Sequence, residues 1–329
     1  MKKSILAVAA LAATLFSCKS NLADPSSPAL PEAVMFGSYV PSTRTAAITS
    51  ANITDFGVYA FYNPSGGWTS DLTPNFMFDQ KVEGSAAAGF TYSPLKYWPK
   101  NEGETISFFA YAPYKSASNG ISESSNPASA GSPVLRYELP AAEEDQVDLL
   151  VADPLPGQTA FDGLVRFNFS HALSRIGVSV KTPASVIASG SSVFLNSLEI
   201  KAAFPAYGLL DLGSGEWINL AAGDLRAYPR DFGAGESGLS VGTSEYPVLT
   251  GDGYVMCLPS GSIRTSLTVT YTVVTPDSAL AAGKSVIVNT VELETGVTAL
   301  SGKTFTIILN LTPEAVEFDT PLVSDWEDA

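Results

Sequence analysis

The chain has one histidine, His171, and only two cysteines, Cys18 and Cys257. Common zinc sites combine several histidine and cysteine ligands, so these residues leave little room for one. His171 lies in a strand-like stretch, residues 168–173, where a packed and hydrogen-bonded imidazole is expected rather than a catalytic base. We therefore predict that the protein holds no metal or cofactor and is not an enzyme.

Two short motifs point to catalysis or nucleotide binding but lack the context that either needs. Residues 238–242 match G-x-S-x-G, yet a nucleophile elbow requires a strand–turn–helix and a histidine later in the chain. His171 comes before Ser240, and no helical pattern follows the motif. Residues 233–238 match G-x-G-x-x-G, but no βαβ unit surrounds them, so we interpret them as a glycine-rich loop.

Cys18 carries a more definite chemical signal. Two lysines at positions 2 and 3 precede an apolar run, residues 5–16, that is too short to span a bilayer and is typical of a signal peptide. The run closes with Leu15-Phe16-Ser17-Cys18, which matches a bacterial lipobox. In a lipobox the cysteine is acylated and becomes the first residue of the mature chain, which is then membrane-anchored. The alternative is an ordinary signal peptide over residues 1–17 that happens to contain a cysteine.

Composition narrows the class of protein further. The 329 residues are 45% hydrophobic and 16% charged, as in globular proteins, and the formal net charge is −15. Such an acidic chain repels phosphate backbones, so nucleic acid is not an expected partner. With Cys18 acylated, Cys257 has no cysteine to pair with. We predict that it is buried in its apolar run, residues 254–258.

Most ordered segments read as strands. Residues 18–32 are rich in Pro, Ser and Ala and form a predicted flexible tether. Period-2 or aromatic and β-branched patterns then recur between turn signals, at residues 53–62, 106–111, 164–180, 192–200, 266–274, 285–293 and 304–311. Residues 184–190 and 220–228 could each hold a helical turn. The pattern predicts an all-β fold of antiparallel sandwiches. A turn-rich stretch, residues 153–163, predicts two domains, residues 33–160 and 161–329.

Several segments, in order, resemble the fimbrillin family, the type V pilins of Bacteroidales. They are Thr-Arg-Thr-Ala at 43–46 followed by 53–60, the aromatic segments 92–99 and 106–113, then 146–152, 165–176 and Val-Ser-Asp-Trp at 323–326. The resemblance runs from the lipobox to residue 326 and is densest over 43–180. Over residues 181–303 the chain resembles the family only in its general character.

This resemblance implies a fold and a mode of assembly. The fold is two tandem transthyretin-like antiparallel β-sandwich domains. A surface protease would cut between Arg44 and Thr45, and the strand within residues 34–40 would be lost. A carboxyl-terminal strand of the next subunit would then fill the opened groove. The candidate donor residues are Val316, Phe318, Leu322 and Trp326.

The same resemblance predicts the partners and the location. Partners are other copies or related pilus subunits joined head to tail, the outer membrane through lipid on Cys18 before processing, and host glycans or proteins. The location is the outer membrane and cell surface, in the fimbrium. Asp277-Ser278-Ala279 resembles an O-glycosylation acceptor of this bacterial group.

Two alternatives to a stalk subunit stay open. Some family members continue further past the tryptophan that corresponds to Trp326. If the last strand completes its own domain, the protein would be a tip or anchor subunit. A non-polymerising adhesin is the other alternative, in which Trp68 and Trp217, each beside a glycine-rich turn, could stack on sugars.

Overall fold

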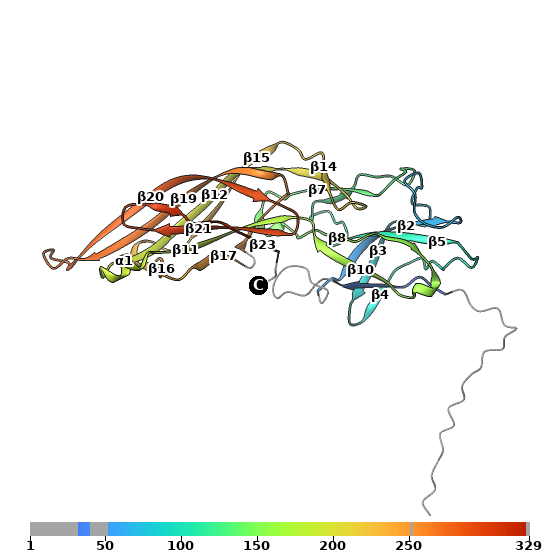
Figure 1. The fold of residues 1–329 in the computed structure, drawn as a ribbon, viewed down its shortest axis with the longest axis horizontal. Coiled ribbons are helices and arrows are strands. Elements are labelled where there is room, and N and C mark those ends of the chain that lie inside the picture. The colour runs from blue at the N-terminus through green and yellow to red at the C-terminus, as the bar shows by residue number, and fades with distance from the viewer. Residues whose placement is uncertain (1–31, 40–51, 251–252, 327–329) are drawn as a thin grey trace, which may run out of the picture.

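The structure, a computed structural model, describes residues 32–39, 52–250 and 253–326. These residues form an elongated molecule of four β-sheets, with one short α-helix, α1 (Ala184–Ala188), and three 3-10 turns, η1 (Glu143–Asp145), η2 (Ala160–Asp162) and η3 (Gly235–Ser237) (Figure 1). The predicted all-β class is confirmed. No helix within the described ranges has the length and apolar character needed to cross a membrane.

An eight-stranded sheet occupies one end of the molecule (Figure 1). Its strand order is β1-β10-β8-β5-β2-β3-β4, and β9 also pairs with β5. The strands are β1 (Phe36–Tyr39), β2 (Asp55–Asn63), β3 (Met77–Ser85), β4 (Gly89–Thr91), β5 (Thr105–Ala112), β8 (Leu150–Ala152), β9 (Leu155–Gln158) and β10 (Val165–His171).

The central strands of this sheet are buried on both faces, which explains their nearly continuous apolar sequences. Val58 and Ala60 of β2 point into one core, and Tyr59 and Phe61, which alternate with them, point into another. The second face packs against a four-stranded sheet of order β14-β13-β7-β6. Its strands are β6 (Ile121–Glu123), β7 (Val134–Glu138), β13 (Tyr207–Asp211) and β14 (Trp217–Ile218).

Two further sheets enclose the core at the other end of the molecule (Figure 1). The six-stranded sheet contains β11 (Ser174–Lys181), β17 (Tyr246–Leu249), β18 (Val255–Cys257), β21 (Lys303–Leu311), β22 (Val316–Phe318) and β23 (Leu322–Asp325). The five-stranded sheet contains β12 (Ser192–Pro205), β15 (Gly223–Asp231), β16 (Leu239–Val241), β19 (Gly261–Pro276) and β20 (Lys284–Ala299).

Strand pairing crosses the domain boundary expected after residue 160. β10 completes the sheet that begins with β1, and β13 pairs with β7 of the first half of the chain. A third buried cluster joins the two ends of the molecule, since it contains Tyr137 and Leu149 as well as Leu258 and Trp326. The division into residues 33–160 and 161–329 stays a prediction.

Two local expectations have different outcomes. The helical turn expected at 184–190 is α1, but the one expected at 220–228 is wrong, because residues 223–231 form β15. Nine consecutive residue pairs with β12 hold that segment extended, and this long-range pairing overrides its local helical character.

Cys257 is buried as predicted, and burial raises the pKa of its thiol to about 12. The serine of the G-x-S-x-G match, Ser240, lies within β16 opposite Phe194. It is therefore not on the strand–turn–helix that a nucleophile elbow needs.

Candidate functional site

Backbone hydrogen bonds hold the edge strand β1 and the two residues that precede it. It pairs in parallel with β10, from Phe36 opposite Val165 to Tyr39 opposite Asn168. The amide of Val165 donates to the carbonyl of Met35 at 2.9 Å, and the amide of Val34 donates to the carbonyl of Lys96 at 2.9 Å. The first strand is thus part of the eight-stranded sheet rather than a loose extension.

Phe36 inserts into a set of four aromatic rings, which we call the aromatic cage. Its ring centroid lies 5.2 Å from that of Tyr92, 5.8 Å from those of Phe108 and Phe167, and 6.3 Å from that of Phe56. Most of these contacts are edge-to-face or tilted, the arrangements that aromatic quadrupoles prefer. Burying one phenylalanine side chain stabilises by about 1.5–3 kcal/mol. Phe36 is therefore the side chain through which β1 reaches the core.

Alternation along the segment explains this insertion. Val34 and Phe36 are buried, whereas Met35 between them is 42% exposed. Period-2 alternation sends neighbouring side chains to opposite faces of the sheet, so only every second residue reaches the core. The predicted strand at 34–40 is present as β1.

The predicted processing residues Arg44 and Thr45 lie outside the described residues, as does the predicted lipidation residue Cys18. The described chain stops at residue 39 after β1 and resumes at residue 52 before β2. The cut site and the lipid site stay predictions.

The carboxyl-terminal strands pair with a strand of their own sheet. β22 and β23 both run antiparallel to β21, and Leu322 lies opposite Thr306. Of the four predicted donor residues, Val316 and Trp326 are buried, whereas Phe318 is 40% and Leu322 is 53% exposed. The segment is therefore anchored at its two ends and exposed between them.

Trp326 is the stronger of the two anchors. Its ring stacks on His171, with centroids 4.6 Å apart and planes 5° apart, and the guanidinium of Arg175 lies 4.9 Å from the ring centroid. His171 Nδ1 is 2.7 Å from Asp148 Oδ2, and the amide of Trp326 donates to the carbonyl of Gly302 at 2.8 Å. The packed and hydrogen-bonded role predicted for His171 is confirmed. The sequence pattern did not indicate that Asp148 would contact His171 or that Arg175 would contact Trp326.

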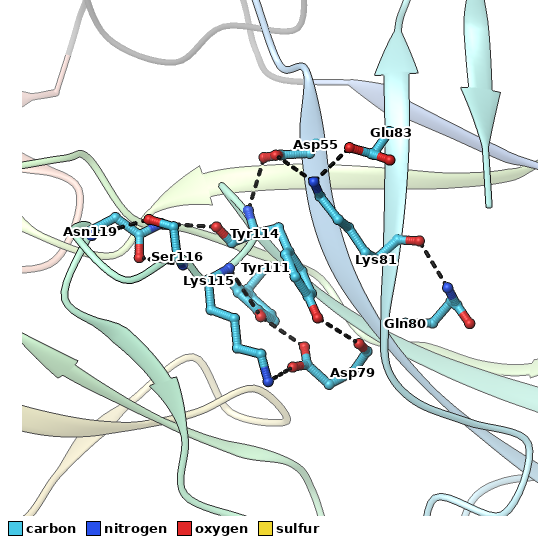
Figure 2. Close-up of polar contacts among 10 residues, drawn as sticks. All are labelled: Asp55, Asp79, Gln80, Lys81, Glu83, Tyr111, Tyr114, Lys115, Ser116 and Asn119. Atoms are coloured by element: carbon cyan, nitrogen blue, oxygen red, sulfur yellow. Dashed lines mark hydrogen bonds and ion pairs between the residues drawn. The ribbon is translucent and has the colours of Figure 1, made fainter. Parts of the chain in front are cut away.

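A polar network that sequence reasoning missed links the eight-stranded sheet to the four-stranded sheet. Its centre is Asp79 of β3, which is buried. Tyr111 donates a hydrogen bond to Asp79 Oδ1 at 2.7 Å, and Lys115 Nζ lies 2.6 Å from Oδ2 (Figure 2). Lys115 also lies 2.5 Å from Glu123 on β6. Asp79 has φ of +46°, a left-handed conformation that aspartate tolerates better than most residues. We call these residues the Asp79 network.

Electrostatics in this network favour a charged lysine and neutral tyrosines. Burial lowers the pKa of Lys115, but its bonds to Asp79 and Glu123 outweigh burial, so the pKa is raised overall. Burial and the nearby Asp79 carboxylate raise the pKa of Tyr59 and of Tyr111 well above the usual range. The described residues include no group of three or more His, Cys, Asp or Glu side chains placed to hold a metal. Because Lys115 pairs with Asp79 of one sheet and Glu123 of the other, the network is suited to bracing the two sheets.

The buried tyrosines predict how stability depends on alkaline pH. Burial also raises the pKa of Tyr137, so the folded chain keeps these phenol protons more tightly than the unfolded chain does. Their contribution to stability is complete below about pH 10, the pKa of a free tyrosine, and is lost as the pH rises above it. In a spectrophotometric titration, we expect part of the 13 tyrosines to ionise only when the β circular-dichroism signal is lost. All 13 ionising together, near pH 10 and with the fold intact, would contradict this prediction.

Trp217 has a packing role. Its indole Nε1 donates to the carbonyl of Ala172 at 2.7 Å, and its ring meets Tyr137 edge-to-face at 6.2 Å. These contacts join β14 to the chain between β10 and β11. These two contacts give Trp217 a packing role between the four-stranded sheet and the end of β10.

With this geometry in place, comparison with known proteins decides the family. A family model described as fimbrillin-like matches residues 43–326. The chain belongs to the fimbrillin-like family. The resemblance stated from the sequence is therefore confirmed. Membership of this family agrees with the prediction that the chain is not an enzyme.

Individual relatives support the same assignment. Fimbrium subunit Fim1C of Phocaeicola vulgatus is 29% identical over 171 residues, 48% of this chain and 45% of that protein, so the match spans about half of each. The crystal structure of a fimbrial protein from Bacteroides vulgatus aligns with a TM-score of 0.69 at 20% identity, over 89% of this chain and 99% of the other. A Bacteroides ovatus protein with a suggested role in cell adhesion aligns with a TM-score of 0.57 at 14% identity, over 90% and 98% of the two chains. At these identities the two structural matches establish a shared fold.

Proposed function

We propose that this fimbrillin-like chain is a structural subunit of a type V pilus. In this proposal it is built from two tandem transthyretin-like sandwiches and exported as a lipoprotein through Cys18. After a cut following Arg44 it polymerises head to tail by β-strand exchange at the cell surface, and the fimbrium supports adhesion. The observation that carries the proposal is the position of β1, which is an edge strand, the first strand described, and inserted into the aromatic cage through Phe36.

Removing β1 would create the kind of site that strand exchange needs. The edge of β10 would lose its parallel partner, and Phe108 and Phe167 of the cage would lose the ring of Phe36. Exposed apolar surface and an unpaired strand edge both favour the addition of a strand from another chain. Because the joining surfaces on the two copies differ, the contact is head to tail and builds a filament.

The carboxyl-terminal segment has features of a donor strand. Phe318, Leu322 and Val323 are all at least 40% exposed in their present position on β21, so moving them to a buried groove would gain apolar burial. The hydrogen bonds to β21 would be exchanged for a ladder of similar strength. Release of Trp326 from His171 is the main cost of this transfer.

Limited digestion of a lipid-free chain starting at residue 19, with an arginine-specific protease, tests the proposal. Arg44 is the only Lys or Arg between Lys19 and Lys81. The six other arginines all lie within strands, where proteases cut poorly: Arg136, Arg166, Arg175, Arg226, Arg230 and Arg264. We expect one cut after Arg44, loss of the fragment that contains β1, and a ladder of oligomers on gel filtration and native gels.

Arg44→Lys is the matched control for this digestion. This variant should resist the arginine-specific protease, keep the fragment that contains β1 and form no ladder of oligomers. Loss of the β1 fragment without any oligomers would contradict polymerisation by strand exchange.

The pairing of β23 with β21, together with the burial of Trp326, favours a second candidate, a tip or anchor subunit that keeps its carboxyl-terminal strand. A chain ending at residue 314 separates the two roles. If the segment is a donor, the cut form of this truncated chain accepts a strand but cannot donate one, so it should shorten the ladders formed by cut parent chains. Ladders that keep their length when it is added would favour the second candidate.

A further inference from the structure

A cleft of about 380 Å³ lies where the two halves of the chain meet. Its wall combines Trp68 and Phe109 with two prolines, Pro154 and Pro156, and Asp211 and Ser214 line it as well. The volume falls in the range of small-molecule sites, which also tend to lie between structural units. None of these residues takes part in the proposed strand exchange.

The apolar wall is rigid. Trp68 follows β2 and packs edge-to-face on Phe61 at 6.4 Å and on Phe109 at 5.6 Å. The indole is only partly buried, so part of its surface remains accessible. Pro154 precedes β9 and Pro156 lies within it, and proline rings have little freedom to move. Flat, rigid apolar surfaces of this kind stack against the C–H faces of sugar rings.

Asp211 supplies an oriented acceptor beside this wall. Its Oδ1 accepts the amides of Gly213 at 2.7 Å and Ser214 at 3.2 Å, which fixes the carboxylate in the turn after β13. A carboxylate has about four lone-pair positions on its two oxygens, so it can accept more hydrogen bonds than these two. The hydroxyls of a sugar are suitable donors.

A second cleft, of about 260 Å³, adjoins the first and shares Pro154 and Ser214 with it. It is more polar and is lined by Asp153, Ser170 and His171, among others. Asp153 accepts a hydrogen bond from Asn168 at 2.7 Å, so this carboxylate is also held in place. We call these two neighbouring clefts the trough; the first has an aromatic wall, and the second is lined by hydroxyl and carboxylate groups.

We propose that this trough binds a neutral oligosaccharide, with one sugar ring against Trp68 and the next toward Asp153. The two carboxylates, on a chain of net charge −15, disfavour acidic sugars such as sialic acid and favour uncharged hydroxyl-rich ones. The site is separate from the aromatic cage, but its second cleft includes His171, on which Trp326 stacks. Binding is therefore measured on the uncut chain, in which Trp326 keeps this position.

Calorimetric titration of the uncut lipid-free chain with lactose, N,N′-diacetylchitobiose and mannobiose tests the proposal, with 3′-sialyllactose as the acidic counterpart of lactose. We expect at least one neutral disaccharide to bind with millimolar affinity, as is usual for a short ligand. Trp68→Ala and Asp211→Ala should each weaken that binding about 10-fold or more. If the neutral ligand is lactose, sialyllactose should bind more weakly by a similar factor.

Two matched controls separate binding from folding. Trp98→Phe changes a tryptophan in the core on the opposite face of the eight-stranded sheet, outside both clefts. Asp277→Ala changes an aspartate that also accepts a turn amide, that of Ala279 at 2.9 Å, but lies at the end of β19. Both should bind like the parent chain. If Asp211→Ala does not fold, Asp211→Asn keeps an acceptor for the turn amides and should still bind less well. The proposal is overturned if no neutral disaccharide binds up to about 20 mM, or if folded Trp68 and Asp211 variants bind as tightly as the controls.

Discussion

Phe36→Ala should lower the free energy of unfolding by about 3–5 kcal/mol, the usual cost of truncating a buried phenylalanine. The ring is 2% exposed and contacts four others, so alanine would leave a cavity inside the aromatic cage. Urea unfolding of the uncut, lipid-free chain, followed by tryptophan fluorescence, measures the change.

Met35→Ala is the internal control for this prediction. Met35 directly precedes β1, yet it points outward and is 42% exposed, so its truncation should change stability little. Equal stability of the two variants would mean that the cage does not hold β1.

The same substitution has a consequence for assembly under the proposed function. A donor strand can enter only after β1 has left, and the burial of Phe36 in the aromatic cage helps to keep β1 in place. Once cut after Arg44, the Phe36→Ala chain should therefore form oligomers faster than the cut parent chain. Slower assembly, with the variant folded, would indicate that loss of β1 does not limit the rate.

Asp79→Ala should cost about 3 kcal/mol, at the low end of what breaking a buried ion pair costs. Removing the carboxylate leaves the Tyr111 hydroxyl and the Lys115 ammonium without their shared partner (Figure 2). The side chain of Lys115 is 27% exposed and keeps Glu123, which limits the loss. Alanine also tolerates the left-handed backbone at this position less well than aspartate does. Chemical unfolding monitored by circular dichroism measures the effect.

Asp79→Asn and Glu83→Gln divide this effect into parts. Asparagine keeps an acceptor for Tyr111 and accepts the left-handed conformation, so its cost should be smaller than that of alanine and should come from the lost charge. Glu83 pairs with Lys81 on the surface of the same strand, where ion pairs contribute little, so its change should be nearly neutral. A stability for Asp79→Ala close to that of Glu83→Gln would show that the Asp79 network does not brace the two sheets.

Strand positions were predictable because strands that bury alternate residues have apolar residues at every second position of their sequence. The segments expected at 53–62, 106–111 and 304–311 appear as β2, β5 and β21 with shifts of one or two residues. The burial of Cys257 and the packed role of His171 follow from the same local signal, since both lie in apolar strand-like stretches. The family was recognisable because several such segments occur in a characteristic order.

Pairing partners and polar clusters were not predictable in this way. Residues 220–228 have a locally helical character, and only their register with β12 makes part of them a strand. β1 pairs in parallel with β10, which lies 129 positions further along the chain, and the residues of either strand alone do not indicate this partner. Asp79, Lys115 and Glu123 come from three separate segments, and none is unusual in its own sequence context.

The amino-acid sequence thus determined which residues are apolar, which segments are extended and, through Phe36, that the first strand has a side chain to bury. Tertiary structure alone decided that this side chain meets Phe56, Tyr92, Phe108 and Phe167, and that Trp326 stacks on His171. The physical reason is the range of the interactions. Alternation is a property of neighbouring residues, whereas pairing and side-chain contact join residues that only the folded chain brings within a few ångströms of each other.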